Sequence, residues 1–490
     1  MAKCLHTTTT LLNDKCPTPS TGDPFRIQKL AKYWSYFLNN SPPTFGIQDW
    51  FHGQSFSAIG SASPSMMFVG KLVKQKPALW RELLHREQRI GGPTNPVITC
   101  DIPEIPVVLK CYYVSRERCS PPALKGETRA HARNVQNSRE GAQQALIYEK
   151  GVYSCIISNL DEVPFFVYPI ATVEQECTAD EINLFMTGRQ LPSTTQTLMS
   201  NVYRMNGGCI LPGKFHITVS EDCGKLKLSE YIDRPWGYLM WQHKLGGKEG
   251  FEMESSLKKW VLQEGLPTSK IRPDLFYQLK QKYMRKYFVA VLQLLTGLES
   301  MQRHKICHND LHFANILVKQ NERFFFNYLD QKVVTVVSDG DPVIEMTDMI
   351  KIFDWDRATS KDQGRNTFLE HIEFYTEAYN PSADMLGVLK TLYYTDKSKF
   401  GKLAEVTMAG SVDTIAKLPA WAREKYDPDR AWLTCKPGGA RHGGCDDAWT
   451  EDVHKLVRKW GTEVYRNAVN IIIGIDKEIK HKLWLTHLDV

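Results

Sequence analysis

The sequence predicts an α+β protein in which a strand-rich part precedes a helical part. Near the N-terminus, FSAIGSAS from Phe56 and the following MMFVGKLV indicate a strand, a turn of small residues and a second strand. Another strand is expected at 106–114 (PVVLKCYYV), because β-branched and aromatic residues dominate it. Residues 275–301 instead repeat apolar side chains at helical spacing, which predicts a long amphipathic helix.

Three further segments extend this pattern. Residues 143–157 (QQALIYEKGVYSCII) have helical spacing, and Glu149 falls on an otherwise apolar face, where a carboxylate needs a buried cation. Residues 214–232 predict a strand, a connector and the start of a helix. Residues 350–358 (IKIFDWDRA) predict a short apolar strand that ends in an aspartate.

Length, charge and hydropathy indicate the broad class of protein. A chain of 490 residues predicts two or three domains, or one large domain with insertions. The net charge of +6 is mild for this length, so there is no strong nucleic-acid signal. The start, MAKCLHTTTTLL, lacks the apolar core of a signal peptide, and no apolar run has the length of a membrane span. We therefore expect an intracellular, soluble protein.

The cysteine pattern favours thiols over disulfides. Twelve cysteines are scattered from Cys4 to Cys445 with no short repeated spacing, which indicates buried thiols in a chain without a secretory signal. Cys435 and Cys445 flank His442, but a second ligand pair for zinc is missing. A glycine-rich surface loop is the preferred interpretation of that segment, with metal binding as the alternative.

The most informative segment is HNDLHFANILV, residues 308–318. Asp310 and Asn315 stand five residues apart, and an apolar strand-like run follows them. In a phosphoryl-transfer site, a carboxylate accepts or orients the proton of the acceptor hydroxyl, while an amide oxygen helps to hold Mg²⁺ on the nucleotide phosphates. The H-x-D-x-x-x-x-N spacing provides both groups.

This spacing alone also fits a polar loop after a helix. Three fixed positions give about one chance match per 8000 starts at average residue usage. Asp354 strengthens the case, because it ends an apolar strand where a second Mg²⁺ ligand is required. Lys110 on a strand and Glu149 on a helix occur upstream in the order of the ion pair that positions the α- and β-phosphates.

Together these motifs resemble the eukaryotic-type protein kinases and their relatives over residues 51–400. The resemblance is specific at HNDLHFANILV and IFDWDRA and degenerate elsewhere. The D-W-D tripeptide with long insertions is similar to the protein-kinase-like phosphotransferases of large DNA viruses, especially iridoviruses. For a viral protein, the expected location is the host cytoplasm or the virion.

The resemblance implies a bilobal protein-kinase-like fold with a strand-rich small lobe and a helical large lobe. Residues 1–50 would be an N-terminal extension. Residues 51–220 would form the small lobe, with a basic insertion near 115–140. The large lobe would occupy 221–400, and 401–490 would be its helical C-terminal extension.

The resemblance also implies roles for individual residues, with ATP and Mg²⁺ as cofactors. Asp310 would be the catalytic base, supported by Lys110 and Asn315, and the metal ligands would be Asn315 and Asp354. Asp384 would hold the backbone of the catalytic loop. The expected nucleotide-binding positions are Gly60, Ser61, Lys110, Glu149, Glu221 and Cys223.

The sequence departs from the kinase pattern at several positions. The glycine-rich loop is reduced to Gly60, and Asp356 replaces the glycine of D-F-G. No A-P-E tripeptide lies between Asp354 and Asp384. Asn309 stands where many kinases have arginine, so the motif has no cation there to grip a phosphorylated activation segment. The long gap between Asn315 and Asp354 implies an inserted pair of strands around FFFNYL and KVVTVVS.

Three functional classes fit these residues. The favoured one is a serine/threonine protein kinase that transfers the γ-phosphate of ATP to a protein hydroxyl. The second is a small-molecule kinase of the aminoglycoside or choline kinase type, which shares H-x-D-L-H-x-x-N. The third is a catalytically weak pseudokinase scaffold, because the glycine loop is poor. The oligomeric state is not predicted.

Overall fold

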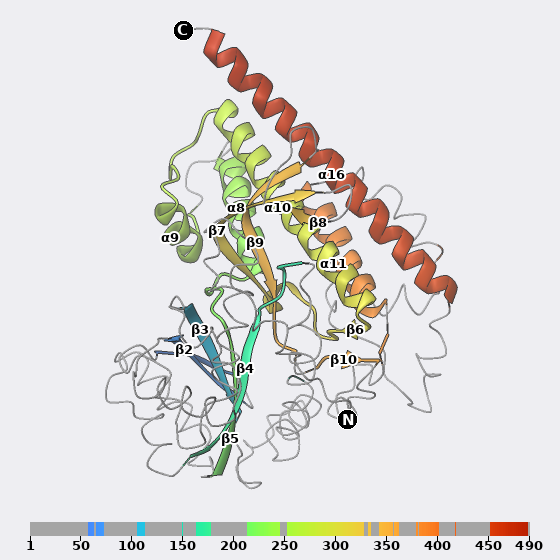
Figure 1. The fold of residues 1–490 in the computed structure, drawn as a ribbon. Coiled ribbons are helices and arrows are strands. Elements are labelled where there is room, and N and C mark those ends of the chain that lie inside the picture. Colours follow the sequence, from blue (N-terminus) through green and yellow to red (C-terminus); the bar gives the residue numbers. More distant parts are fainter. Residues whose placement is uncertain are drawn as a thin grey trace, which may run out of the picture. The chain divides into compact units, whose positions relative to one another are not determined.

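The computed structural model describes residues 57–62, 65–72, 105–112, 149, 163–177, 213–245, 252–327, 332–334, 343–355, 357–361, 379–380, 382–400, 417 and 451–488. These residues form a mixture of helices and strands (Figure 1), which confirms the α+β prediction. The contacts divide the chain into two compact units. The first unit runs to Asp222 and also includes 304–308 and 354–379; the second comprises 223–303, 309–353 and 380–490.

The first unit contains an antiparallel five-stranded sheet in the order β1-β2-β3-β5-β4. The strands are β1 (Ser57–Ala62), β2 (Ser65–Leu72), β3 (Ile105–Tyr112), β4 (Pro169–Cys177) and β5 (Gly213–Glu221). The two strands expected near the N-terminus are thus present as β1 and β2. In β3 the side chains alternate, since Ile105, Val107 and Leu109 are buried. Lys110 therefore projects from the opposite face of the sheet.

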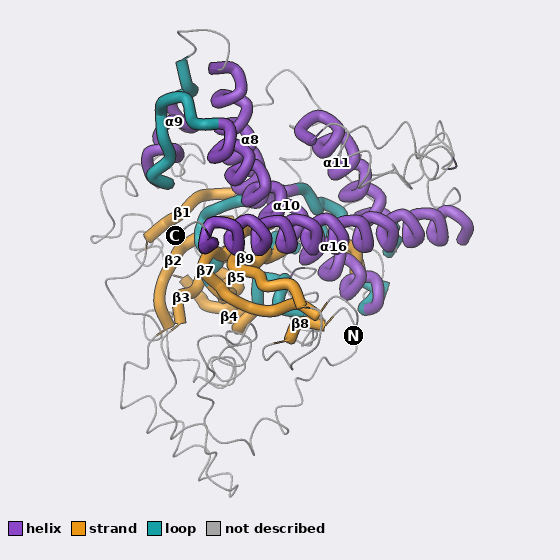
Figure 2. The backbone as a smooth tube through the Cα atoms, turned by 90° about the horizontal axis from the view of Figure 1, so that it is seen from above, coloured by secondary structure: helices purple, strands orange, loops and turns teal. Residues whose placement is uncertain are grey.

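The second unit is built around α10 (Pro273–Arg303), which matches the helix expected at 275–301. Its middle is buried almost all round, as a helix at the centre of a core requires. The other helices described in this unit are α8 (Leu228–Leu245), α9 (Ser255–Gln263), α11 (Ala383–Phe400) and α16 (Glu451–Leu488). Figures 1 and 2 show α16 against α10, and α16 also packs on α11. Residues 451–488 of the predicted helical extension are thus helical.

A three-stranded antiparallel sheet in the second unit has the order β8-β7-β9. It consists of β7 (Ile316–Asn327), β8 (Lys332–Val334) and β9 (Val343–Ile352). The extra strands expected between Asn315 and Asp354 are therefore confirmed. The apolar strand that was expected to end at Asp354 ends two residues earlier, at Ile352, because Asp354 has a φ of 73° and leaves the extended conformation. At the base of this sheet, Ile316 pairs with Ile352.

A buried polar cluster joins three elements of the second unit. Tyr231 of α8 donates a hydrogen bond to Oδ2 of Asp348 in β9 at 2.7 Å. The ammonium of Lys286 in α10 lies 3.1 Å from the same oxygen. Burial, and then the Asp348 carboxylate, raise the pKa of Tyr231, so the phenol keeps its proton and remains the donor. The side chain of Gln293 in α10 makes two hydrogen bonds to the β9 backbone. Its Nε2 donates to the Asp348 carbonyl, and its Oε1 accepts from the Ile350 amide.

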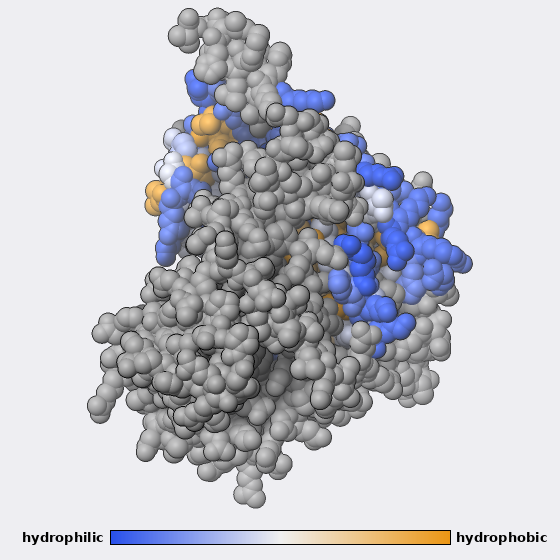
Figure 3. Space-filling model, viewed as in Figure 1, coloured by the Kyte–Doolittle hydropathy of each residue, from blue (hydrophilic) through white to orange (hydrophobic). Residues whose placement is uncertain are grey.

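The described surface is mostly hydrophilic in the view of Figure 3, with small hydrophobic areas. Leu262 and Met240 are among its exposed apolar residues. No helix in the described part of the chain is long and apolar enough to cross a membrane. Cys223 and Cys307 are buried and form no disulfide, as the cysteine pattern predicts.

Candidate active site

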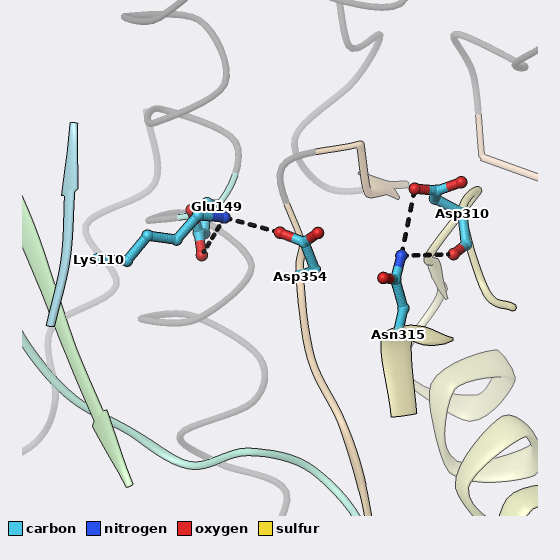
Figure 4. A network of polar contacts seen from close by, with 5 residues as sticks. All are labelled: Lys110, Glu149, Asp310, Asn315 and Asp354. Atoms are coloured by element: carbon cyan, nitrogen blue, oxygen red, sulfur yellow. Dashed lines mark hydrogen bonds and ion pairs between the residues drawn. The ribbon is translucent and has the colours of Figure 1, made fainter. Parts of the chain in front are cut away.

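In the first unit, the ammonium of Lys110 is held between two carboxylates (Figure 4). Lys110 Nζ lies 3.3 Å from Oε2 of Glu149 and 2.7 Å from Oδ1 of Asp354. The expected Lys110–Glu149 ion pair is therefore present. Glu149 is only 1% exposed, as predicted for a carboxylate on an apolar helix face that needs a cation. The second contact, with Asp354, was not anticipated from the sequence.

The electrostatics of this cluster keep Asp354 ionised. Burial alone would raise the pKa of the Asp354 carboxyl group. The charge and hydrogen bond of Lys110 act in the opposite direction, with smaller contributions from Arg357 and His308, and hold the pKa below its ordinary value. The Asp354 side chain is 31% exposed, so it is only partly shielded from solvent.

The backbone at Asp354 is fixed by aromatic packing. Trp355 is fully buried, and its ring centroid lies 4.7 Å from that of His308 and 5.8 Å from that of Phe166. These contacts anchor Trp355, the residue after Asp354. Asp354 itself has a left-handed φ of 73°. Non-glycine residues adopt this conformation rarely, although aspartate and asparagine tolerate it best. A strained backbone held by packing is common at functional sites.

In the second unit, Asp310 and Asn315 form one hydrogen-bonded loop. Asn315 Nδ2 donates to the Asp310 carbonyl at 2.9 Å and to Asp310 Oδ2 at 3.2 Å (Figure 4). Both residues are buried. A short 3-10 helix, η5 (Phe313–Asn315), leads directly into β7 and sets the direction of the Asn315 side chain. Because Nδ2 makes both bonds, the amide oxygen Oδ1 is directed away from Asp310.

The residue before Asp310 is held by α11. The Asn309 amide donates to Oδ1 of Asp384 at 3.0 Å, which is the backbone contact that the kinase resemblance implies. Asn309 has a φ of 65° and is 2% exposed. The amide side chain that replaces the usual arginine is therefore buried in the fold.

His312 is a further residue of this loop that sequence reasoning gave no role. Its Nδ1 accepts the Ala314 amide at 3.2 Å and caps η5. In the neutral ring the proton therefore lies on Nε2, which is 3.9 Å from Asp310 Oδ1. A sequence signal for His312 does exist, because it is the second histidine of the H-x-D-L-H-x-x-N pattern.

The other predicted nucleotide-binding residues have defined positions. Gly60 and Ser61 lie in β1, opposite Met67 and Met66 of β2, beside an irregularity in the register. Glu221 ends β5, and its carboxylate accepts the Tyr168 amide at 3.0 Å. It thus has a structural contact in addition to its predicted role. Cys223 is buried in the second unit.

Several predictions fall outside the described residues. These are the N-terminal extension at 1–50, the basic insertion near 115–140, Asp356, most of the residues between Asp354 and Asp384 where the A-P-E tripeptide is missing, and the Cys435–Cys445 loop. No protein-family model matches this sequence, and a search of curated proteins returned no match. The candidate active site is thus defined by its motifs and by the contacts described above.

Proposed function

We propose that this protein is an ATP-dependent phosphotransferase that transfers the γ-phosphate of ATP to a hydroxyl group, with Mg²⁺ as cofactor. The observation that carries the proposal is the position of Lys110. Its ammonium contacts a buried glutamate from a helix and a partly exposed aspartate from a strained turn. A salt bridge needed only for stability requires neither the exposed carboxylate nor the left-handed backbone.

In this proposal Lys110 binds oxygens of the α- and β-phosphates. Glu149 has no access to solvent and stays with the ammonium, so it orients Lys110 during binding. Asp354 is partly exposed and ionised, and in this proposal its carboxylate exchanges the lysine for a metal ion.

The donor atoms of the two motifs fit magnesium. Mg²⁺ takes oxygen ligands and is bound by one or two carboxylates together with substrate phosphates. Asp354 would supply a carboxylate oxygen, and Asn315 would supply the amide Oδ1 that is directed away from Asp310. A bound ion would neutralise negative charge on the transferred phosphate.

Asp310 acts on the acceptor. The acceptor oxygen forms a bond to the γ-phosphorus, the bond from that phosphorus to the bridging oxygen of ATP breaks, and ADP leaves. The proton of the acceptor hydroxyl passes to Asp310, whose carboxylate is positioned by the Asn315 amide.

A serine or threonine of a protein is the proposed acceptor, by the resemblance to protein kinases. One observation favours a small alcohol instead: His312 completes the H-x-D-L-H-x-x-N pattern of small-molecule kinases and caps η5. Turnover of ATP against a panel of protein substrates, peptides and small alcohols separates the two. Transfer to small alcohols with none to any protein would favour the second function.

Two substitutions test the assignment of donor and acceptor roles. Asp354→Ala should weaken Mg²⁺-dependent ATP binding by at least about tenfold, because it removes a ligand of the donor complex. Asp310→Asn should leave that binding intact and lower turnover by about 100-fold or more, the usual contribution of a general base. Calorimetric titration measures binding, and labelled-phosphate transfer measures turnover.

The exposed Asp274 of α10 provides the matched control for Asp310→Asn. Asp274→Asn makes the same aspartate-to-asparagine change away from the motifs. It should change neither property. Absence of Mg²⁺-dependent nucleotide binding by the folded parent protein would refute the proposed function. Full turnover by Asp310→Asn would refute the role of Asp310.

We further expect an enzyme that is active without phosphorylation of its own chain. Switching by phosphorylation needs a cation beside the catalytic aspartate to bind the new phosphate. Here that neighbour is Asn309, an uncharged and buried amide. Phosphatase treatment of the purified protein should therefore leave its turnover unchanged, and loss of activity on treatment would contradict the expectation.

A further inference from the structure

The start of α16 is bonded to the residue that precedes α11. Nδ1 of His454, in the first turn of α16, lies 2.8 Å from Oγ of Ser382. Ser382 is buried, its amide donates to Oδ1 of Asn380 at 3.0 Å, and its carbonyl accepts the Leu386 amide at 2.9 Å. His454 is thus attached to a residue whose backbone is already fixed within the first turn of α11.

The same turn of α11 supports the Asp310 loop. Asp384 lies two residues after Ser382, and its carboxylate accepts the Asn309 amide at 3.0 Å. A continuous path of hydrogen bonds and short backbone segments therefore links His454, Ser382, Asp384 and Asn309 to Asp310. All of these residues belong to the second unit.

The loop needs such support because its backbone is strained. Asn309 has a φ of 65°, and a non-glycine residue keeps this conformation only where its surroundings over-determine it. The Asp384 carboxylate can meet the Asn309 amide only if the first turn of α11 stays in place. Asn380 holds that turn from within its own segment, and His454 holds it from α16.

We infer that His454 is a positioning residue for Asp310, acting through Ser382 and Asp384. Its effect on turnover rests on the proposed function, whereas its effect on the loop does not. Consistent with a neutral ring that bonds Ser382, burial lowers the pKa of His454; Glu451 opposes this shift and Arg458 adds to it.

Three variants test the inference. His454→Phe keeps a ring of similar size but removes the nitrogen, and Ser382→Ala removes the other partner. Each should lower kcat by about tenfold, the factor that corresponds to one hydrogen bond of ordinary net strength, with the KM for ATP unchanged. The double variant should lose no more than either single variant, because both remove the same bond. His454→Asn, which keeps a polar group near the position of Nδ1, should recover most of the activity.

Hydrogen exchange supplies a readout that does not depend on catalysis. The amides of Asn309, His312, Ala314 and Asn315 are all hydrogen-bonded in the loop. Deuterium uptake by a peptide that covers residues 308–316 should rise in His454→Phe and Ser382→Ala and return toward the parent level in His454→Asn. If the parent transfers no phosphate to any acceptor, the proposed function fails, and this measurement still decides the role of His454.

The matched control breaks another contact of α16. Arg285 of α10 donates to Asp476, with Nη2 and Oδ2 3.0 Å apart, so Asp476→Asn loosens the helix at a different point. This variant should lower the melting temperature without changing kcat or loop uptake. The inference would be overturned if His454→Phe kept parental kcat and uptake, or if Asp476→Asn raised loop uptake to the same extent.

Discussion

At the scale of the residue, the two polar motifs share an unusual backbone. Asn309 and Asp354 have φ values of 65° and 73°. Glycine adopts such values most easily, and among other residues asparagine and aspartate are the most tolerant. The backbone conformation therefore restricts the residue type at both positions. The kinase pattern accounts for the Asp354 side chain but gives no reason for asparagine at 309; the left-handed backbone supplies one.

The backbone at Asn309 leads to a prediction about stability. Asn309→Val should cost about 1–3 kcal/mol more than Asn309→Gly, because a β-branched residue is strongly disfavoured at positive φ. Urea unfolding of the two variants measures the difference. Gln320→Val, at an exposed position in β7, is the control and should be nearly neutral. Equal stability of the valine and glycine variants would show that the strain is absent.

The sequence predicted part of this geometry. A lysine on a strand and a glutamate on an apolar helix face required each other, because neither charge can be buried alone. The Lys110–Asp354 contact could not be predicted in the same way, because the sequence pattern assigned the Asp354 carboxylate to a metal ion and gave it no lysine partner. Nor does periodicity report a left-handed φ at a single residue. Such features depend on tertiary packing, here the burial of Trp355 beside His308.

At the scale of the element, the cluster of Tyr231, Asp348 and Lys286 joins α8, β9 and α10. Tyr231→Phe should destabilise the protein by about 1–2 kcal/mol, because it removes one hydrogen bond to a buried carboxylate and leaves Lys286 as its charged partner. Thermal unfolding measures the loss. Tyr277→Phe is the matched control, since the Tyr277 hydroxyl donates to Glu478 at an exposed position. It should cost less than about 0.5 kcal/mol, and similar losses in the two variants would contradict a special role for the cluster.

Element prediction succeeded where the periodicity was strong and local. The long helix α10 and strand β3 follow from side-chain patterns within single segments. The strand β4, with the sequence PIATVEQEC, was not predicted, because its glutamates and proline give little strand signal. Strand β4 is stabilised instead by its antiparallel pairing with β5. The predicted end of β9, at Asp354, was two residues too late. The apolar run gives no sign of the left-handed backbone at Asp354, which ends the strand.

At the scale of the whole molecule, the two compact units exchange segments of chain. The first break falls after Asp222, but 304–308 and 354–379 return to the first unit. The sequence pattern predicts lobes that are each one continuous segment of the chain. It gives no signal that short segments from the second half of the chain belong to the first unit. The exchanged pieces include the small pairing of β6 (Ile306–Cys307) with β10 (Thr359–Ser360), which forms only once distant parts of the chain have met.

The C-terminal helix is predicted to be essential for the second unit. Its apolar residues recur at helical spacing and are buried: Val453, Val457, Trp460, Val464, Ala468 and Ile472. Val464→Asp should destabilise the protein by about 4 kcal/mol or more, because it buries an unpaired carboxylate. Asn470→Asp introduces the same group at an exposed position of α16 and should be nearly neutral. Circular dichroism during heating distinguishes them, and a mild effect of Val464→Asp would show that α16 is dispensable.

The base of the β7–β9 ladder has a consequence for how this protein can change in length. Ile316 is opposite Ile352, and the Phe353 amide donates to the Asn315 carbonyl, so these neighbours meet whatever number of residues separates them. Lengthening a loop costs little free energy in general, since each doubling of its length adds only about 0.6 kcal/mol. Insertions or deletions between β8 and β9 would thus alter the size of the gene product while preserving the backbone at the foot of the hairpin. The number of residues between Ile316 and Ile352 is therefore a poor criterion for comparing such proteins. An alignment that penalises gaps would misplace one of these two positions, although the ladder keeps them adjacent.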